Sequence, residues 1–266
     1  MNDSIILLQQ ITEKDFTNIS SQQLDSLLDF MLDHIGNDDS YIRDTLIYTG
    51  FCELILNDHL SNAQLTKLAL TCIDNNHLYF ENKNDAVLTR SFSALAIALL
   101  LYRDQNASFL NEGMAVEVLK KSIGYLNFEH DYRGYIEGKG WAHSIAHGSD
   151  LLAQAVAHPL FSKVASVEEG MEIVQKCLLT EYAYIDEEDE RMLPVIDALF
   201  ESGLTEQCFL QWLEQLQQFQ HEDHLKNYRI HWNIKKFMLS LYIHFISKRQ
   251  YESITNWLLK TYLNKK

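Results

Sequence analysis

Proline and glycine are scarce in this sequence, which has only 2 prolines and 10 glycines in 266 residues. Sheet proteins of this length need many tight turns, and these two residues supply tight turns most readily. Their scarcity therefore favours helices. The sequence also lacks a low-complexity block or a long linker, although we interpret the charged run YIDEEDER (184–191) as a loop and a weak seam. We predict a single all-α domain over residues 1–266.

Closely paired cysteines and long apolar runs are missing as well. Cys52, Cys72, Cys177 and Cys208 form no CxxC pair, which excludes a zinc ribbon and a thioredoxin-type motif. The longest apolar run (94–102) has about half the length of a membrane-spanning helix. The first residues carry no basic segment typical of a signal peptide. We therefore expect a cytoplasmic protein without a membrane span.

Basic residues are few, because 22 Lys and Arg stand against 37 Asp and Glu, for a formal net charge of −15. Such a surface repels phosphate backbones unless a local basic groove overrides the mean charge. Nucleic acid is therefore excluded as an expected partner.

Helical periodicity dominates the rest of the sequence. In segment 20–36, apolar residues recur every three to four positions from Leu24 onward. Capping-box pairs of a serine and a Gln or Glu three residues later stand at Ser20, Ser61 and Ser166. Segment 84–104 is apolar nearly all round, so we expect it to be central and buried. The predicted helices are 20–36, 38–58, 61–74, 84–104, 109–126, 140–157, 166–182, 188–202, 204–220, 228–247 and 250–263.

The connections between these predicted helices are short, so neighbouring helices should be antiparallel. Antiparallel pairs joined in this way stack as an α-solenoid of the HEAT or armadillo kind, and a closed α/α toroid is the alternative. The least helical stretch is 127–140, which is rich in glycine, aromatic and charged residues. Such loops on a rigid helical scaffold are common places for binding sites.

The most unusual stretch is GKGWAHSIAHGSD (138–150), which leads into a predicted helix. At 100° per residue, one face about 80° wide carries polar residues, and the opposite face carries apolar residues that should pack. A solvated polar face would explain this pattern without any function. However, a solvated face usually carries Lys and Glu, and this one is flanked by small and apolar residues. The polar residues are His143, His147, Asp150, Gln154 and His158, and the packing residues include Trp141, Ile145 and Leu152.

Two histidines four apart on a helix can share one metal ion, as they do in zincin proteases. Ser144 stands where a zincin has its catalytic glutamate, so the motif differs from HExxH. His143 and Asp150 are separated by about 10.5 Å of helix rise, which makes Asp150 a better orienting partner for His147 than a metal ligand. A divalent ion such as zinc would need a third ligand, for which His130, Asp131 and Glu137 are candidates.

Arginines and a second amphipathic segment complete the candidate residues. Arg43, Arg90 and Arg133 either form salt bridges between helices or line the same groove as the histidines. In HWNIKKFMLSLY (231–242), Trp232, Lys235, Lys236 and Tyr242 indicate either a packed face with basic solvent residues or a partner-binding ridge.

Three runs of the sequence resemble a bacterial helical family of unknown function: DDSYIRDTLIYTGF (38–51), VLTRSFSALAIALLLYR (87–103) and DYRGYIEGKGWAHSIAHGSDLL (131–152). The resemblance implies a largely helical fold and a shared site, but no activity. AHSIAHG (142–148) is also similar to helix starts of the lanthionine synthetase cyclases, whose zinc-binding cysteines have no counterpart here. The site implied by the first resemblance comprises Asp131, Arg133, Gly140, Trp141, His143, His147 and Asp150.

Together these features predict a cytoplasmic binding or interaction module. Its polar groove would be lined by residues 130–154 with Arg43 and Arg90, and its ligand would be a peptide, a protein or a small polar molecule. The alternative is a metal-dependent hydrolase or related enzyme that uses His143 and His147 as metal ligands.

Overall fold

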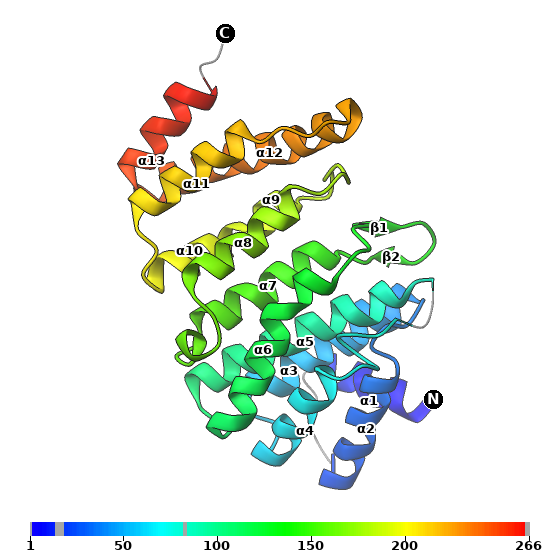
Figure 1. Ribbon diagram of the computed structural model, residues 1–266. Helices are drawn as coiled ribbons and strands as arrows, with labels where there is room; N and C mark the ends of the chain where they lie inside the picture. Colours follow the sequence, from blue (N-terminus) through cyan, green and yellow to red (C-terminus); the bar gives the residue numbers. More distant parts are fainter. Residues whose placement is uncertain (1, 14–18, 82–83, 264–266) are drawn as a thin grey trace.

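The computed structural model describes residues 2–13, 19–81 and 84–263, and these residues are mostly helical (Figure 1). The only strands within these ranges form one short antiparallel hairpin, so the predicted all-α class is confirmed. The α-helices are α1 (Asn2–Thr12), α2 (Ser21–Asp33), α3 (Thr49–Leu56), α4 (Asn62–Cys72), α5 (Ala86–Asn106), α6 (Glu112–Phe128), α7 (Ser144–Ala157), α8 (Val167–Leu178), α9 (Glu188–Arg191), α10 (Leu193–Glu201), α11 (Glu206–Gln218), α12 (His224–Lys248) and α13 (Glu252–Trp257). The strands are β1 (Tyr135–Ile136) and β2 (Gly140–Trp141), and the remaining short helices are η1 (Tyr41–Tyr48), η2 (Phe161–Lys163) and η3 (Leu258–Leu263).

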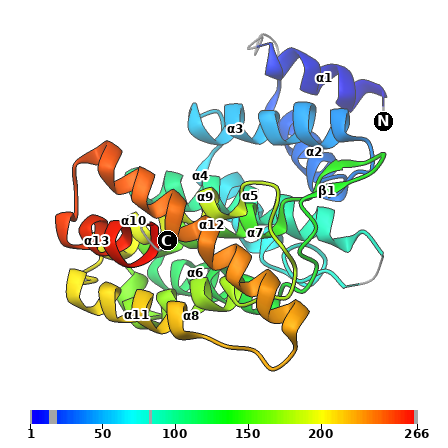
Figure 2. The same ribbon diagram turned by 90° about the horizontal axis from the view of Figure 1, so that it is seen from above.

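The helices follow one another through the molecule in chain order. Figures 1 and 2 show α1 and α2 at one end and α11–α13 at the opposite end, with α5, α6 and α7 between them. One cluster of buried apolar side chains runs from Leu8 in α1 to Leu258 in η3. The three predicted capping boxes are present at the starts of α2, α4 and α8, where Ser20, Ser61 and Ser166 accept a backbone N–H from the residue three positions on.

Several predicted helix limits were wrong, and each error has a local reason. Segment 38–58 divides into the π-helix η1 and α3, and π-helical turns often accompany functional sites. Segment 188–202 divides at Met192 into α9 and α10, because Pro194 stands in the first turn of α10. Gly36 does not end α2, whose last residue is Asp33. A Cβ at Gly36 would lie 2.7 Å from the Thr89 backbone, so this glycine allows close packing on α5.

Helix α5 lies in the core, as its all-round apolar sequence predicted. It is the one helix in the described ranges that is long and apolar enough to cross a membrane, and 78% of its apolar window is buried inside the molecule. Its main neighbour is α7, which also packs against α6 and α10. Helix α7 therefore carries the histidine motif through the centre of the helical array.

Gly148 in the histidine motif is a packing residue. A Cβ at this position would lie 2.4 Å from Leu126 Cδ2 and 2.8 Å from Tyr125 Cε1, so α7 approaches α6 more closely than any larger residue allows. We expect Gly148→Ala to lower the free energy of unfolding by about 1–3 kcal/mol through overpacking. Urea denaturation followed by circular dichroism would measure this loss.

Gly113, in the first turn of α6, provides the control for this prediction. A Cβ there meets only Asn111 Oδ1, at 3.5 Å. Gly113→Ala should leave stability unchanged or raise it by up to about 1 kcal/mol, since alanine restricts the unfolded chain. Equal effects of the two substitutions would contradict a packing role for Gly148.

Candidate functional site

A tight hairpin, rather than a helical turn, leads into α7. Tyr135 pairs with Trp141 and Ile136 with Gly140, and the turn uses positive φ angles of 77° at Gly138 and 85° at Gly140. The carbonyl of Gly134 accepts hydrogen bonds from the backbone N–H groups of Ala142 at 2.7 Å and His143 at 3.0 Å. The prediction of a helix from residue 140 was therefore wrong, because backbone bonding to Gly134 delays the helix start to Ser144.

His143 is the residue on which the chain turns from the hairpin into α7. Its backbone is left-handed, with φ 48° and ψ 38°, a conformation that few non-glycine residues adopt. Its carbonyl still accepts the first helical hydrogen bond, from the N–H of His147 at 2.8 Å. Left-handed non-glycine residues are concentrated at functional sites, where the surrounding structure enforces them.

Arg43 of η1 connects the hairpin to the core through hydrogen bonds. Its side chain is fully buried, and Nη2 donates to the carbonyl oxygens of Lys139 at 2.8 Å and Trp141 at 3.3 Å. The guanidinium also lies 4.8 Å from the centre of the Phe92 ring. Gly140 packs closely against η1 and the residue before it, since a Cβ at this position would lie 3.1 Å from Ser40 Cβ and 3.4 Å from Arg43 Nη2. Arg43 and Gly140 thus position the site.

Four rings contact one another in sequence from the surface to α5, and we call Phe92, Trp141, His143 and His147 the imidazole cluster. The Trp141 and His143 rings are parallel, with centroids 4.3 Å apart and an interplanar angle of 6°. His143 and His147 are 5.6 Å apart, and Phe92 meets His147 edge-on at 5.1 Å. Trp141 was predicted to pack on the apolar face of a helix, but it lies in β2 and is 43% exposed.

The two imidazoles share an unusual property. Nδ1 of His143 and Nδ1 of His147 are both buried from solvent and have no hydrogen-bond partner in the protein. Buried polar atoms are nearly always paired, so two unpaired nitrogens on neighbouring rings require an explanation. His147 is only 6% exposed, which places one of these nitrogens deep in the molecule.

Burial keeps both histidines neutral. It lowers the pKa of His147 well below 6.5, and the nearby His143, Arg191 and Arg43 lower it further, whereas a hydrogen bond with the Ser91 backbone acts in the opposite direction. Burial also lowers the pKa of His143, with Arg191 acting in the same direction and Asp186 and Glu187 opposing it. Each ring therefore offers one N–H donor and one lone pair near neutral pH.

An ion pair borders the imidazole cluster. Arg191 of α9 binds Asp150 of α7 through both Nε and Nη2, and the Nε–Oδ1 distance is 3.3 Å. Burial raises the pKa of Asp150, and Arg191 opposes that rise. Tyr48 adjoins this pair, and its ring packs edge-on to Phe92 at 6.3 Å. The prediction that Asp150 orients His147 was therefore wrong, since Arg191 takes the carboxylate.

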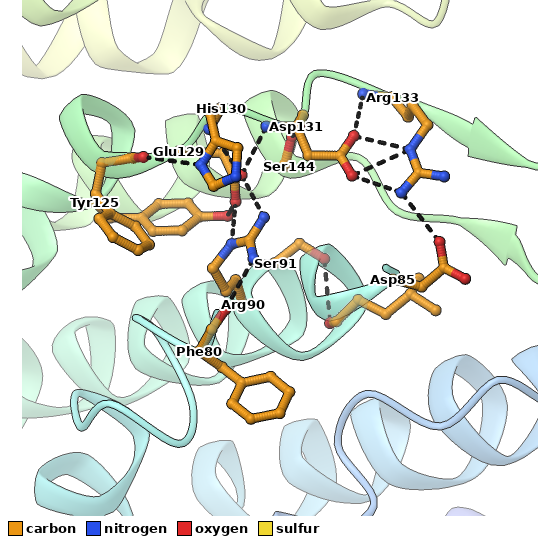
Figure 3. A network of polar contacts seen from close by, with 12 residues as sticks. Phe80, Asp85, Arg90, Ser91, Tyr125, Glu129, His130, Asp131, Arg133 and Ser144 are labelled. Atoms are coloured by element: carbon orange, nitrogen blue, oxygen red, sulfur yellow. Dashed lines mark hydrogen bonds and ion pairs between the residues drawn. The ribbon is translucent and has the colours of Figure 1, made fainter. Parts of the chain in front are cut away.

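The remaining predicted residues lie apart from the imidazole cluster. Arg90 is buried and forms two hydrogen bonds to Glu129, at 2.8 and 2.6 Å (Figure 3). Arg133 binds Asp131 and also Asp85, the latter at 3.0 Å (Figure 3). These contacts favour the salt-bridge interpretation of the arginines over the groove interpretation. Arg90, Asp131 and Arg133 line a separate cavity of about 340 Å³.

Gln154, near the C-terminal end of α7, is hydrogen-bonded to α5. Its side-chain and backbone oxygens accept hydrogen bonds from Gln105 Nε2 at 3.2 and 3.0 Å. Gln154 therefore links α7 to α5 and does not extend the imidazole cluster, although the helical wheel placed it on the same face.

The candidate third metal ligands do not join the two histidines. No group of three His, Cys, Asp or Glu side chains suited to a metal ion occurs among the residues that the structure describes. Asp131 is bound to Arg133, and Ser144 Oγ donates to the Asp131 carbonyl. Within the described ranges, the protein itself therefore provides His143 and His147 but no further ligand beside them.

Three residues that surround the histidines were missed, because nothing in the sequence indicates that they belong to the site. Phe92 lies in an all-apolar helix, Tyr48 lies in an amphipathic segment, and Arg191 closes the charged run that we interpreted as a loop. They reach the histidines only because α5, η1 and α9 all pack around α7. The one relevant hint was an arginine directly after five consecutive acidic residues, which did not indicate a partner.

The fold and the site thus define an all-α protein with a buried pair of neutral imidazoles beside an arginine–carboxylate pair. Residues 76–243 match the family model described as "Protein of unknown function (DUF2785)", and the chain belongs to this family. The matched region contains α5, the hairpin, α7, α9 and most of α12, but not Arg43 or Tyr48. No curated protein and no solved structure matches the chain.

Proposed function

We propose that this protein is a binding module for a small polar ligand or a polar peptide group, bound at the imidazole cluster. The unpaired Nδ1 atoms of His143 and His147 carry this proposal. An unsatisfied buried polar atom costs about 1–3 kcal/mol, and a ligand that pairs with both atoms recovers that cost on binding. The exposed Trp141 ring gives such a ligand a flat apolar surface to stack on.

The surrounding scaffold suits such a role. The left-handed His143, the Arg43 contacts with β2 and the Asp150–Arg191 pair hold the two rings in fixed positions before any ligand arrives. Preorganisation of this kind reduces the entropy lost on binding. We also infer that the helix layers form an α-solenoid, since helices follow one another through the molecule in chain order (Figure 1). We further propose a cytoplasmic location, for which the acidic composition is the support.

The ¹⁵N chemical shifts of the two imidazole rings respond directly to hydrogen bonding at this site. The test is an NMR titration of ¹⁵N-histidine-labelled protein with a panel of amino acids, dipeptides, monosaccharides and nucleosides. At least one compound is expected to shift the Nδ1 signals of both His143 and His147. His147→Phe should weaken its binding about tenfold, the value of one lost hydrogen bond. His224→Phe, at an exposed position in α12, should bind as the parent does.

Two results would oppose the proposal. One is that no compound in the panel shifts either histidine. The other is that His147→Phe binds with unchanged affinity while circular dichroism shows that it remains folded. In that case the unpaired nitrogens have a structural cause.

A metal-dependent hydrolase is the second candidate, because the same two nitrogens could ligate a divalent ion such as zinc. Water or substrate would have to supply the other ligands. Elemental analysis of untagged protein should then find stoichiometric metal that is lost in His143→Ala and in His147→Ala. A protein that contains no metal, and whose stability a chelator leaves unchanged, would exclude this candidate.

A further inference from the structure

Helix α12 exposes a row of large apolar side chains along its whole length. They are between 40% and 63% exposed, whereas apolar residues of this size in a helix usually face the core. The first and last residues of the row are 21 positions apart, or about 32 Å along the helix. We call it the outer stripe, and it consists of Leu225, Tyr228, Trp232, Leu239, Ile243 and Ile246.

The outer stripe is separate from the face that attaches α12 to the core. Residues such as Ile234, Phe237 and Leu241 are fully buried on the opposite side of the helix. Each residue of the outer stripe follows the last by three, four or seven positions, so all six share one face. Helix α12 thus has two apolar faces, and the part of the chain that the structure describes covers only one of them. Contiguous exposed apolar surface of this kind marks interaction sites.

The spacing of residues in the outer stripe is symmetric about its centre. The intervals from Leu225 to Ile246 are three, four, seven, four and three residues. In an antiparallel helix pair related by a two-fold axis, residues equidistant from the centre face each other. Leu225 would then meet Ile246, Tyr228 would meet Ile243, and Trp232 would meet Leu239. We propose that the outer stripe pairs antiparallel with that of a second copy of this chain, forming a homodimer.

Charges at the ends of the outer stripe fit the same register. Glu222 and Asp223 precede α12, and Arg249 follows the stripe at its other end. Lys248, next to Arg249, is bound to Asp197 of its own chain at 2.6 Å and adds nothing to this contact. Antiparallel pairing brings the acidic end of one copy against the basic end of the other, twice in each dimer. A parallel pair would instead place like charges together. These ends therefore favour the antiparallel arrangement.

Two further residues shape the centre of this surface. Lys236 is held by Asp189 of its own chain at 3.1 Å, which turns its charge toward α9. Lys235 stays exposed near the two-fold axis and limits the strength of the contact. Beside the stripe, Trp232 Nε1 donates to the Tyr184 carbonyl at 3.1 Å, and the next residue, Ile185, is 69% exposed. Ile185 therefore extends the apolar surface outside α12.

Sedimentation velocity of the full-length protein from about 1 to 100 µM tests the proposal. We expect reversible dimerisation, weakened at least about tenfold by Leu239→Glu and by Ile243→Glu. Leu56→Glu in α3 is the matched control, because Leu56 is 41% exposed and Leu239 is 44% exposed. Circular dichroism should show that all three variants fold. A protein that stays monomeric at 100 µM, or a dimer that both α12 variants leave intact, would overturn the proposal.

Disulfide trapping tests the register itself, in a Cys208→Ser background because Cys208 is exposed. Lys235→Cys places the thiol beside the two-fold axis and should give a covalent dimer on mild oxidation. Leu225→Cys should not cross-link to itself, because its equivalent lies at the far end of the pair. The combined Leu225→Cys and Ile246→Cys variant should cross-link. Efficient dimerisation of Leu225→Cys alone would show a parallel pair and overturn the antiparallel register.

Discussion

Replacing Glu129 with alanine is expected to lower the free energy of unfolding by about 3–5 kcal/mol, the usual cost of leaving a buried charge without its partner. Glu129 and Arg90 are both buried, and the carboxylate accepts two hydrogen bonds from the guanidinium. It also accepts from Tyr125 Oη at 3.0 Å and from the backbone N–H groups of His130 and Asp131, each at 2.9 Å (Figure 3). Loss of the carboxylate therefore leaves five donor contacts unmade. Urea denaturation measures the result.

Two comparisons separate the buried charge from general damage. Glu181→Ala removes an exposed ion pair with Lys226 and should cost less than about 1 kcal/mol. The double variant Arg90→Met with Glu129→Gln removes both charges but keeps an acceptor for Tyr125 and the backbone. We expect it to be less destabilised than the sum of its two single variants, by about 1–3 kcal/mol. Additive losses would show that the two charges do not stabilise one another.

The same network shows why the fold was easier to predict than the site. The helices α2, α4 and α8 begin where short-range capping signals indicated, since a capping box involves residues only three apart. The Arg90–Glu129 pair joins residues 39 positions apart, and nothing local to either residue identifies its partner. Glu129 was therefore absent from the predicted site, although Arg90 was included.

Neighbouring residues decide part of the geometry of the candidate site, and this part follows from spacing in the sequence. His143 and His147 come close together, as their spacing indicated, even though His143 precedes the helix that the wheel assumed. Asp150 and Gln154 were placed on the same face correctly by periodicity, but distant residues decide what they bind. Arg191 takes Asp150, and Gln105 takes Gln154. Trp141 was misplaced because a hydrophobic residue next to a helix can equally belong to a hairpin, and the two glycines nearby favoured the hairpin.

Lowering the pH from 7.5 to 5.5 is expected to reduce the free energy of unfolding of both the parent protein and His147→Gln. The reduction should be about 1.4 kcal/mol larger in the parent. The ordinary pKa of histidine is 6.5, and burial holds the pKa of His147 well below that value in the folded state. As the pH falls through 6.5, the unfolded chain takes up a proton at this position while the folded protein does not. Protonation thus favours unfolding, and the stability that His147 contributes above pH 6.5 is lost below it. Urea denaturation at both pH values measures the difference.

His224→Gln is the control for this pH effect. His224 is exposed in the first turn of α12, so its replacement should leave the pH dependence of unfolding the same as in the parent. A partner that pairs with Nδ1 of His147 should also change the profile, because a bound acidic group would stabilise the protonated ring and reduce the loss below pH 6.5. If the parent and His147→Gln lose equal stability between pH 7.5 and 5.5, then the folded ring takes up its proton at the same pH as the unfolded chain and is charged at pH 5.5. A charged ring would remove the lone pair at Nδ1, leaving this atom able to bind only a hydrogen-bond acceptor.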